Sequence, residues 1–289
     1  MDSPFLGTEA LRSGALTRAQ LRWNYRAILP NVYVHKDARA SLWMRTKAAW
    51  LWSGRRAIIA GRAAAALHGA LWIDSDIPIE LLWHCPRPPP GIIARNERFS
   101  FDEIVEVRGM YVTSPTRTAL DLARHLTRDP AVAHLDALAR ATGIQSESVL
   151  DLAELYPGAR GLPQARKTLP LLDAGAQSPR ESWLRLLLTD AGFPRPRTQI
   201  PVTDGFSTAY LDMGWDDEMI GCDYDGERHF SDRTRFVHDI GRNELVAGQG
   251  WIVRHVVAEH SRKFIVRRVN EAFRLRGIAL RGTVRPDCA

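Results

Sequence analysis

The stretch Ala209-Tyr-Leu-Asp-Met-Gly-Trp215, followed by Ile220-Gly-Cys-Asp-Tyr-Asp-Gly-Glu-Arg-His229, decides the fold of the C-terminal part of this sequence. Both runs are rich in strand-forming residues, and the polar turn at residues 216–218 between them predicts a β-hairpin. Asp212 lies inside the first run, whereas Asp223 and Asp225 end the second and share a face, because side chains two residues apart in a strand point the same way. Three carboxylates at one sheet edge repel one another unless a cation or a proton intervenes, so the hairpin predicts a metal site. A plain strand-to-turn ending at residues 223–226 is the structural alternative.

The composition is that of an ordinary globular protein with an excess of positive charge. The 289 residues carry a formal net charge of +6, and the sequence pI is about 9.5. Nearly all the cations are arginines, since the lysines are only Lys36, Lys47, Lys167 and Lys263. Arginine favours bidentate contacts with phosphate, so we expect a nucleic acid as partner, although a GC-rich genome would also raise the arginine content.

The sequence shows no sign of secretion or of membrane insertion. Cys85, Cys222 and Cys288 are far apart and odd in number, which predicts neither a disulfide framework nor a zinc site. No apolar run approaches the roughly 20 residues that span a bilayer, and the first five residues lack the basic and apolar segments of a signal peptide. We therefore expect a cytoplasmic protein without a membrane partner, of an α/β class that is α+β overall.

Residues 1–40 have the pattern of a small winged helix. A helix from about Leu6 ends at Ser13-Gly14, Thr17 is a good N-cap for a second helix, and residues 32–35 form a strand. In a winged helix the second helix would present Arg18 and Arg22 to a DNA groove. The alternative is a three-element mini-domain whose arginines are simply solvated.

Residues 41–172 predict a mixed α/β middle domain. Four motifs in the N-terminal half occur in a characteristic order: Gly14-Ala-Leu-Thr-Arg-Ala-Gln-Leu21, Leu29-Pro-Asn-Val-Tyr33, Ala64-Ala-Ala-Leu-His-Gly69 and Val112-Thr-Ser-Pro-Thr-Arg-Thr-Ala-Leu-Asp121. Over about residues 6–125 this set resembles AbiEi-type antitoxins and their winged-helix relatives. The resemblance implies DNA binding, often in transcriptional autoregulation, and a cognate toxin as a possible partner.

Residues 178–289 predict a mixed sheet flanked by helices, after a linker at residues 173–177. Ser178 caps a helix with Pro179 at its first position and Glu181 at its third, which is the pattern of a capping box. The hairpin follows, then a helix to about Ala247, a strand at residues 251–257 and a basic helix at residues 261–276. The order α, β, β-hairpin, α, β, α gives a mixed α/β sheet.

Five separated motifs within residues 178–257 resemble the PD-(D/E)XK nuclease superfamily, and most closely the small nucleases related to very-short-patch mismatch repair endonuclease. They are Ser178-Pro-Arg-Glu-Ser-Trp-Leu184, Tyr210-Leu-Asp-Met-Gly-Trp215, Ile220-Gly-Cys-Asp-Tyr-Asp-Gly226 followed by His229, Asp239-Ile-Gly-Arg-Asn-Glu-Leu245, and Gly250-Trp-Ile-Val-Arg254. The resemblance implies a restriction-endonuclease-like fold, with Asp212 and Asp223 as metal ligands and Glu181 as a supporting acid.

The sequence departs from the superfamily pattern at three places. Asp225 occupies the position of the usual lysine, although Asp-Gly is common there in this branch. Asp223 is one methylene shorter than the usual glutamate. An arginine often precedes the first aspartate, where Tyr210 and Leu211 stand here, so substrate contacts are expected to differ.

The residue types fit phosphodiester hydrolysis with Mg²⁺ or Mn²⁺. Mg²⁺ takes oxygen ligands, so Asp212, Asp223 and a backbone carbonyl near Tyr224 would suffice to hold it. His229 can transfer a proton near neutral pH, or it is a surface histidine. The residues expected to steady the phosphate are Arg235, Arg242 and, less directly, Arg254. Arg242 could equally form a surface ion pair with Asp239.

Two functions from different classes follow. The first is a DNA-binding protein that cuts or nicks DNA with a metal-dependent endonuclease domain, using the catalytic set Glu181, Asp212, Asp223, Asp225 and His229. The second is a non-catalytic DNA-binding transcriptional regulator or antitoxin whose nuclease-like domain is only a scaffold. The residues do not distinguish DNA from RNA as the substrate of the first.

Overall fold

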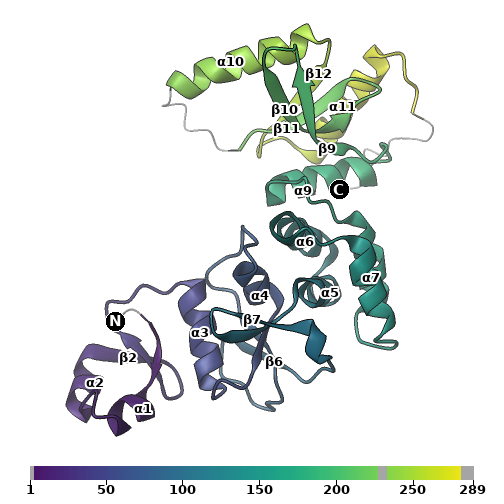
Figure 1. Ribbon diagram of the computed structural model, residues 1–289. Coiled ribbons are helices and arrows are strands. Elements are labelled where there is room, and N and C mark those ends of the chain that lie inside the picture. Colours follow the sequence, from purple (N-terminus) through teal and green to yellow (C-terminus); the bar gives the residue numbers. More distant parts are fainter. Residues whose placement is uncertain (1–2, 227–232, 281–289) are drawn as a thin grey trace. The chain divides into compact units, whose positions relative to one another are not determined.

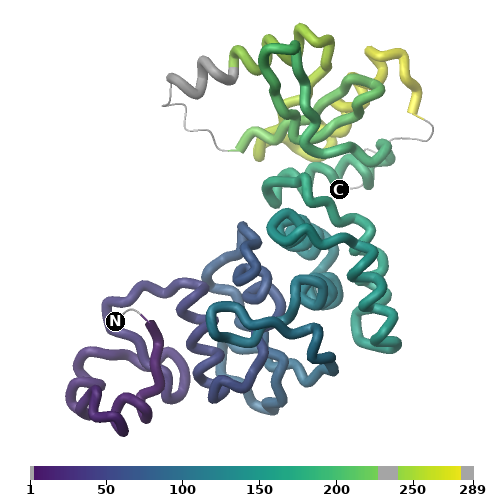
Figure 2. Tube along the Cα trace, viewed as in Figure 1, coloured from purple at the N-terminus to yellow at the C-terminus, as the bar shows by residue number. Residues whose placement is uncertain are grey.

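The structure is a computed structural model that describes residues 3–226 and 233–280, without the side chains of residues 233–239. The chain divides into two compact units, Met1–Leu172 and Asp173–Ala289. Helices and β-sheets occur in both units (Figure 1), and the same division can be followed along the chain trace (Figure 2). The predicted α/β class is confirmed. No helix in the described ranges is both long and apolar enough to cross a bilayer.

The N-terminal part of the first unit is a helix–turn–helix followed by strands. Its elements are β1 (Phe5–Leu6), α1 (Gly7–Arg12), α2 (Arg18–Asn24), β2 (Tyr25–Leu29) and β3 (Val32–His35), and the sheet order is β1-β3-β2. Helix α2 begins where the sequence predicted, because the Thr17 hydroxyl accepts the Gln20 N–H while the Gln20 side chain accepts the Thr17 N–H. Strand β2 was not predicted from the sequence.

The rest of the first unit is a five-stranded mixed sheet with helices. The strands are β4 (Ile58–Ala60), β5 (Ile79–Leu82), β6 (Ile92–Arg95), β7 (Ile104–Val107) and β8 (Met110–Thr113), in the order β6-β5-β4-β8-β7. The helices are α3 (Leu42–Trp52), α4 (Gly61–Leu67), α5 (Pro115–His125), α6 (Arg128–Thr142), α7 (Ser146–Glu154) and α8 (Leu162–Thr168), with 3-10 turns at Phe101–Glu103 and Leu169–Leu171. The β7–β8 hairpin forms because Arg108 and Gly109 both adopt positive φ, as a tight two-residue turn requires.

The second unit is a four-stranded sheet with helices on both faces. Its elements are α9 (Pro179–Asp190), β9 (Arg197–Thr203), β10 (Thr208–Trp215), β11 (Ile220–Tyr224), α10 (Arg233–Gly248), β12 (Ile252–Val256) and α11 (Arg262–Leu275). The order is β12-β11-β10-β9, and all neighbours are antiparallel except the parallel pair β11–β12. The predicted mixed sheet flanked by helices is therefore confirmed.

Two apolar clusters hold this sheet. One contains residues of α9, β10, β11 and α11, among them Leu184, Met213, Cys222 and Phe273, all of them buried. The other contains Ile200, Leu211 and, from α10, Val246. Residues 173–177, predicted to be a linker, are bonded to the second unit, since the Thr198 hydroxyl donates to the Asp173 carboxylate at 2.8 Å.

Candidate functional site

The two predicted metal ligands meet where the strands of the β10–β11 hairpin separate. Backbone pairing between these strands runs from Trp215 and Ile220 to Met213 and Cys222. Beyond the Met213–Cys222 pair, hydrogen bonds from backbone N–H groups to aspartate side chains replace the bonds between the two backbones. The Asp212 N–H donates to Asp223 Oδ1 at 2.9 Å, and the Tyr224 N–H donates to Asp212 Oδ2 at 2.7 Å. Each aspartate is thus anchored to the backbone of the opposite strand, which fixes the two carboxylates beside each other.

Both carboxylates line one pocket of about 320 Å³. The pocket is polar, and three acids and one arginine contribute to it. Its lining residues come from β9, β10, β11, α10 and the segments before α9 and after β11: Gln177, Gln199, Tyr210, Asp212, Asp223, Tyr224, Asp225 and Arg242. The lining therefore includes all three predicted acids of the hairpin, although Asp225 lies just beyond the end of β11.

The electrostatics of the pocket disfavour a second negative charge. Asp223 is only 3% exposed. Burial, reinforced by the negative charges of Asp223 and Glu181, raises the pKa of Asp212 to about 7, while the Tyr224 N–H and the Arg242 guanidinium oppose the rise. Near neutral pH Asp212 is therefore partly protonated.

Glu181 lies close enough to act on Asp212 through its charge, and it also organises the start of α9. The Ser178 hydroxyl caps the helix by accepting the Glu181 N–H at 3.2 Å, and it donates to Glu181 Oε1 at 2.9 Å. The other carboxylate oxygen accepts the Gln177 N–H at 2.8 Å. The Ser178 cap is confirmed, but the return bond reaches Gln177 instead of the backbone N–H of the capping residue that a standard capping box uses.

Arg242 is the cation of the pocket. From α10, its Nη2 donates to Asp223 Oδ2 at 2.7 Å and to the Tyr210 carbonyl at 2.6 Å. The side chain is largely buried, and the contact with Asp223 is an ion pair with little access to water. Arg242 therefore neutralises one of the two predicted metal ligands. The side chain of Asp239, its alternative partner, lies outside the described residues.

His255 belongs to this region and was not predicted from the sequence. It lies on β12, where its Cα is the parallel partner of the Asp223 Cα, and its Nδ1 lies 3.2 Å from Asp225 Oδ2. The Asp225 carboxylate raises the pKa of the imidazole, and burial opposes the rise. The one available signal was a histidine inside an apolar strand, but the sequence did not tell which strand would lie next to β11.

The remaining predicted residues lie in several places. His229 is outside the described residues, and so is the Arg235 side chain, although its backbone belongs to α10. Arg254 is not at the pocket. Its Cα pairs with that of the core residue Cys222, and its Nε donates to the Arg268 carbonyl in α11. In the first unit, Arg18 and Arg22 are exposed on α2.

The donor set of the pocket suits a hard cation with a small number of protein ligands. Among the described side chains no hydrogen bond reaches Asp212 Oδ1, so that oxygen is available to a ligand. Carboxylate and carbonyl oxygens are the ligands that Mg²⁺ and Mn²⁺ prefer. Among the described residues, Asp212 and Asp223 belong to no group of three acidic, histidine or cysteine side chains whose ligand atoms all lie within 4.8 Å of one another, so backbone oxygens or water would have to complete the coordination.

A second acidic group, in the first unit, is a charge network. Ligand atoms of Glu97, Asp121 and His125 lie within 4.8 Å of one another. Arginines already neutralise this group: Arg117 Nε donates to Asp121 at 3.1 Å, and Arg124 Nη1 donates to Glu97 at 2.7 Å. We therefore assign no metal to it.

Comparison with known proteins gives two relatives. They are the Uncharacterized protein MT2308 and the Uncharacterized protein Rv2248, both of Mycobacterium tuberculosis, and each is 27% identical to this chain over 215 residues. The alignment covers 73% of this chain and 78% of the relative. No family model matches the chain, and no solved structure matches it.

Proposed function

We propose that the second unit hydrolyses phosphodiester bonds in DNA with a divalent metal ion, and that the N-terminal part of the first unit binds the DNA. The observation that carries the proposal is the mutual anchoring of Asp212 and Asp223 in one pocket. Two carboxylates are held together although burial and mutual repulsion raise the pKa of Asp212 to about 7. Such an arrangement costs stability in the metal-free protein, whereas a divalent cation would offset that cost.

The resemblance of five motifs to the PD-(D/E)XK superfamily supports phosphodiester hydrolysis as the reaction. In this proposal Asp212 and Asp223 hold Mg²⁺ or Mn²⁺, and the Asp212 oxygen without a hydrogen bond is the first point of attachment. The ion, when bound, would supply positive charge to the phosphate oxygens as the bond to the leaving oxygen breaks. Glu181 keeps the pocket negative enough to attract the ion.

The chain offers two histidines for the accompanying proton transfer. His229 is the candidate from the sequence. His255 is the second, because its Nδ1 lies 3.2 Å from Asp225 Oδ2 and no described group bonds to Nε2. An imidazole with a raised pKa gives or takes a proton near neutral pH.

DNA is the favoured substrate because of the helix–turn–helix in the first unit. Helices α1 and α2 precede the strands β2 and β3, and Arg18 and Arg22 are exposed on the second helix. A second helix of this kind docks in a major groove, and arginines on it would contact phosphates or base edges. The resemblance to AbiEi-type antitoxins supports the same assignment.

One observation favours a second candidate function, a non-catalytic DNA-binding regulator or antitoxin with a cognate toxin. Arg242 already occupies Asp223 Oδ2, so the metal must displace or share this guanidinium. In a regulator the ion pair would be permanent, and the second unit would serve as a scaffold or a partner surface.

Incubation with supercoiled plasmid separates the two candidates. We expect the wild-type protein to nick or linearise the plasmid with Mg²⁺ or Mn²⁺ and to be inactive with EDTA. Asp212→Asn should abolish cleavage, whereas Asp217→Asn, an exposed acid in the same hairpin, should retain it. Specific DNA binding without nicking at saturating metal would favour the regulator, and full cleavage by Asp212→Asn would contradict the proposed metal site.

A further inference from the structure

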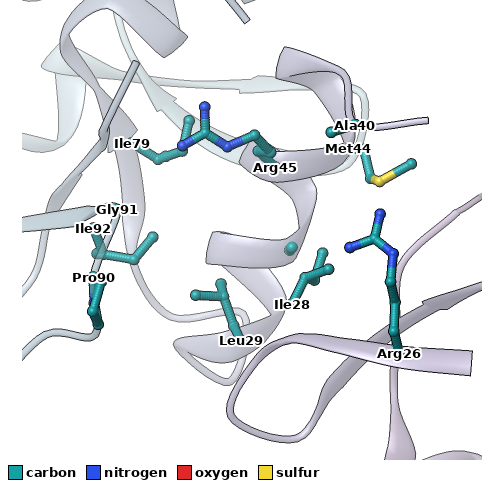
Figure 3. Close-up of a pocket in the computed structure, with 11 residues that line it drawn as sticks. Arg26, Ile28, Leu29, Ala40, Met44, Arg45, Ile79, Pro90, Gly91 and Ile92 are labelled. Atoms are coloured by element: carbon teal, nitrogen blue, oxygen red, sulfur yellow. The ribbon is translucent and has the colours of Figure 1, made fainter. Parts of the chain in front are cut away.

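The first unit contains an apolar pocket that the proposed function does not use. It has a volume of about 220 Å³ and is enclosed by β2, α3, β5 and the segment that leads into β6 (Figure 3). The walls are aliphatic or thioether side chains, four of them buried in the core of the unit. These wall residues are Ile28, Leu29, Met44, Ala48, Ile79 and Ile92.

Two arginines are the charged side chains of the pocket lining, which includes no acidic residue. In Figure 3, Arg45 extends from α3 toward Ile79, and Arg26 extends from β2 toward Met44. Arg45 Nη1 donates to the Ser75 carbonyl at 2.5 Å, and Arg26 Nη2 donates to the Ala38 carbonyl at 3.1 Å. Within the described part of the chain, neither guanidinium forms an ion pair with a carboxylate.

The two guanidinium groups have no carboxylate partner among the described residues, and they lie beside an apolar wall. Together these features define the chemistry of a ligand. The arginine donors left over would bind an anion, and a carboxylate matches the fork of a guanidinium best. An apolar part of the ligand would cover the aliphatic wall, because a small hydrophilic anion would leave that wall in contact with water. A cavity of about 150 Å³ holds benzene, so the larger volume here accommodates a ring together with its carboxylate.

We propose that this pocket binds a small monocarboxylic acid with an apolar body of about the size of a benzene ring. Arg45 is the primary partner of the carboxylate, because it is half-buried and its charge is less screened than that of the exposed Arg26. The ligand would touch Ile28 on the N-terminal sheet and Ile79 on the five-stranded sheet. Binding would therefore tie these two sheets of the first unit together, whether or not the second unit is a nuclease.

Benzoate is the probe, and benzamide is its neutral counterpart of nearly the same shape. Calorimetry on the full-length protein should show saturable benzoate binding with a Kd of about 1 mM or tighter, as a nine-atom ligand allows. Benzamide should bind at least about tenfold more weakly, because it lacks the charge-assisted hydrogen bonds.

Three variants locate the site, and circular dichroism verifies that each is folded. Arg45→Met keeps an unbranched side chain without the charge and should weaken benzoate binding at least about tenfold. Ala40→Trp, at an exposed lining position, should block the pocket, and Arg39→Met, an exposed arginine outside it, should bind as the wild type does. The proposal is overturned if benzoate does not bind saturably, if benzamide binds equally well, or if Arg39→Met loses as much affinity as Arg45→Met.

Discussion

Replacing Asp212 with asparagine should stabilise the second unit and at the same time remove its response to metal. Asparagine has nearly the same shape, and its amide oxygen can still accept the Tyr224 N–H. It carries no charge, so the repulsion from Asp223 and Glu181 disappears. The same substitution would therefore remove metal binding and increase stability. This is expected where carboxylates that repel one another are retained because they bind a ligand.

The size of the stability difference between Asp212→Asn and the wild type follows from the pKa of Asp212. Asp212 has an ordinary value of 3.8 and a value of about 7 in the folded protein. The folded state binds the proton more tightly than the unfolded state, so wild-type stability falls as the pH rises from about 4 to 7. Each tenfold change in proton affinity corresponds to about 1.4 kcal/mol. Ionisation of Asp212 therefore destabilises the folded state by about 4 kcal/mol above pH 7 and by less than about 2 kcal/mol at pH 5. Asp212→Asn should show no such dependence.

Hydrogen exchange of peptides from β10 and β11, followed by mass spectrometry, measures the opening free energy of the second unit by itself. We expect the variant to be more protected than the wild type, and the difference to grow by about 2 kcal/mol between pH 5 and pH 7.5. Mg²⁺ should increase the protection of the wild type and leave Asp212→Asn unchanged. Asp217→Asn is the control, since it changes the same formal charge at an exposed turn.

Two results would refute this reasoning. The first is a stability difference between Asp212→Asn and wild type that does not change with pH, which would mean that Asp212 is ionised at its ordinary pKa. The second is equal stabilisation of both proteins by Mg²⁺, which would place the ion elsewhere.

Three further predictions test the surroundings of the site and the DNA-binding region. Arg242→Met leaves the Asp223 carboxylate buried and unpaired, so urea unfolding without metal should show a loss of about 3 kcal/mol, part of which Mg²⁺ restores. His255→Gln should remove the limb of the pH–rate profile of plasmid cleavage that lies near neutral pH, while an unchanged profile would leave the proton transfer to another group. Arg18→Ala and Arg22→Ala should each weaken DNA binding and lower the slope of log K against log salt by about 0.9, measured by fluorescence anisotropy.

Local signals in the sequence located several elements well. Ser178 caps α9 and Thr17 caps α2, each by accepting the backbone N–H three residues later, as expected of those residue types. These features depend on interactions between residues only a few positions apart, so a short stretch of sequence is enough to predict them. Strand β2 was missed because its apolar residues show no clear alternation, and its pairing with β3 is what holds it in an extended form.

For the candidate site, the sequence by itself determined that Asp212 and Asp223 would be neighbours. A short hairpin sets its own register, because the turn fixes which residues face each other. Only the tertiary structure decided which other groups join them. His255 lies beside Asp223 through the parallel pairing of β11 with β12, and Arg242 reaches Asp223 from α10.

The same distinction holds in the first unit, where the pocket with Arg26 and Arg45 is enclosed by elements that are more than 60 residues apart in the chain, from β2 to β6. Parallel strand pairing and helix docking are set by burial of apolar surface between distant segments, and no local pattern of residues encodes which segments will meet.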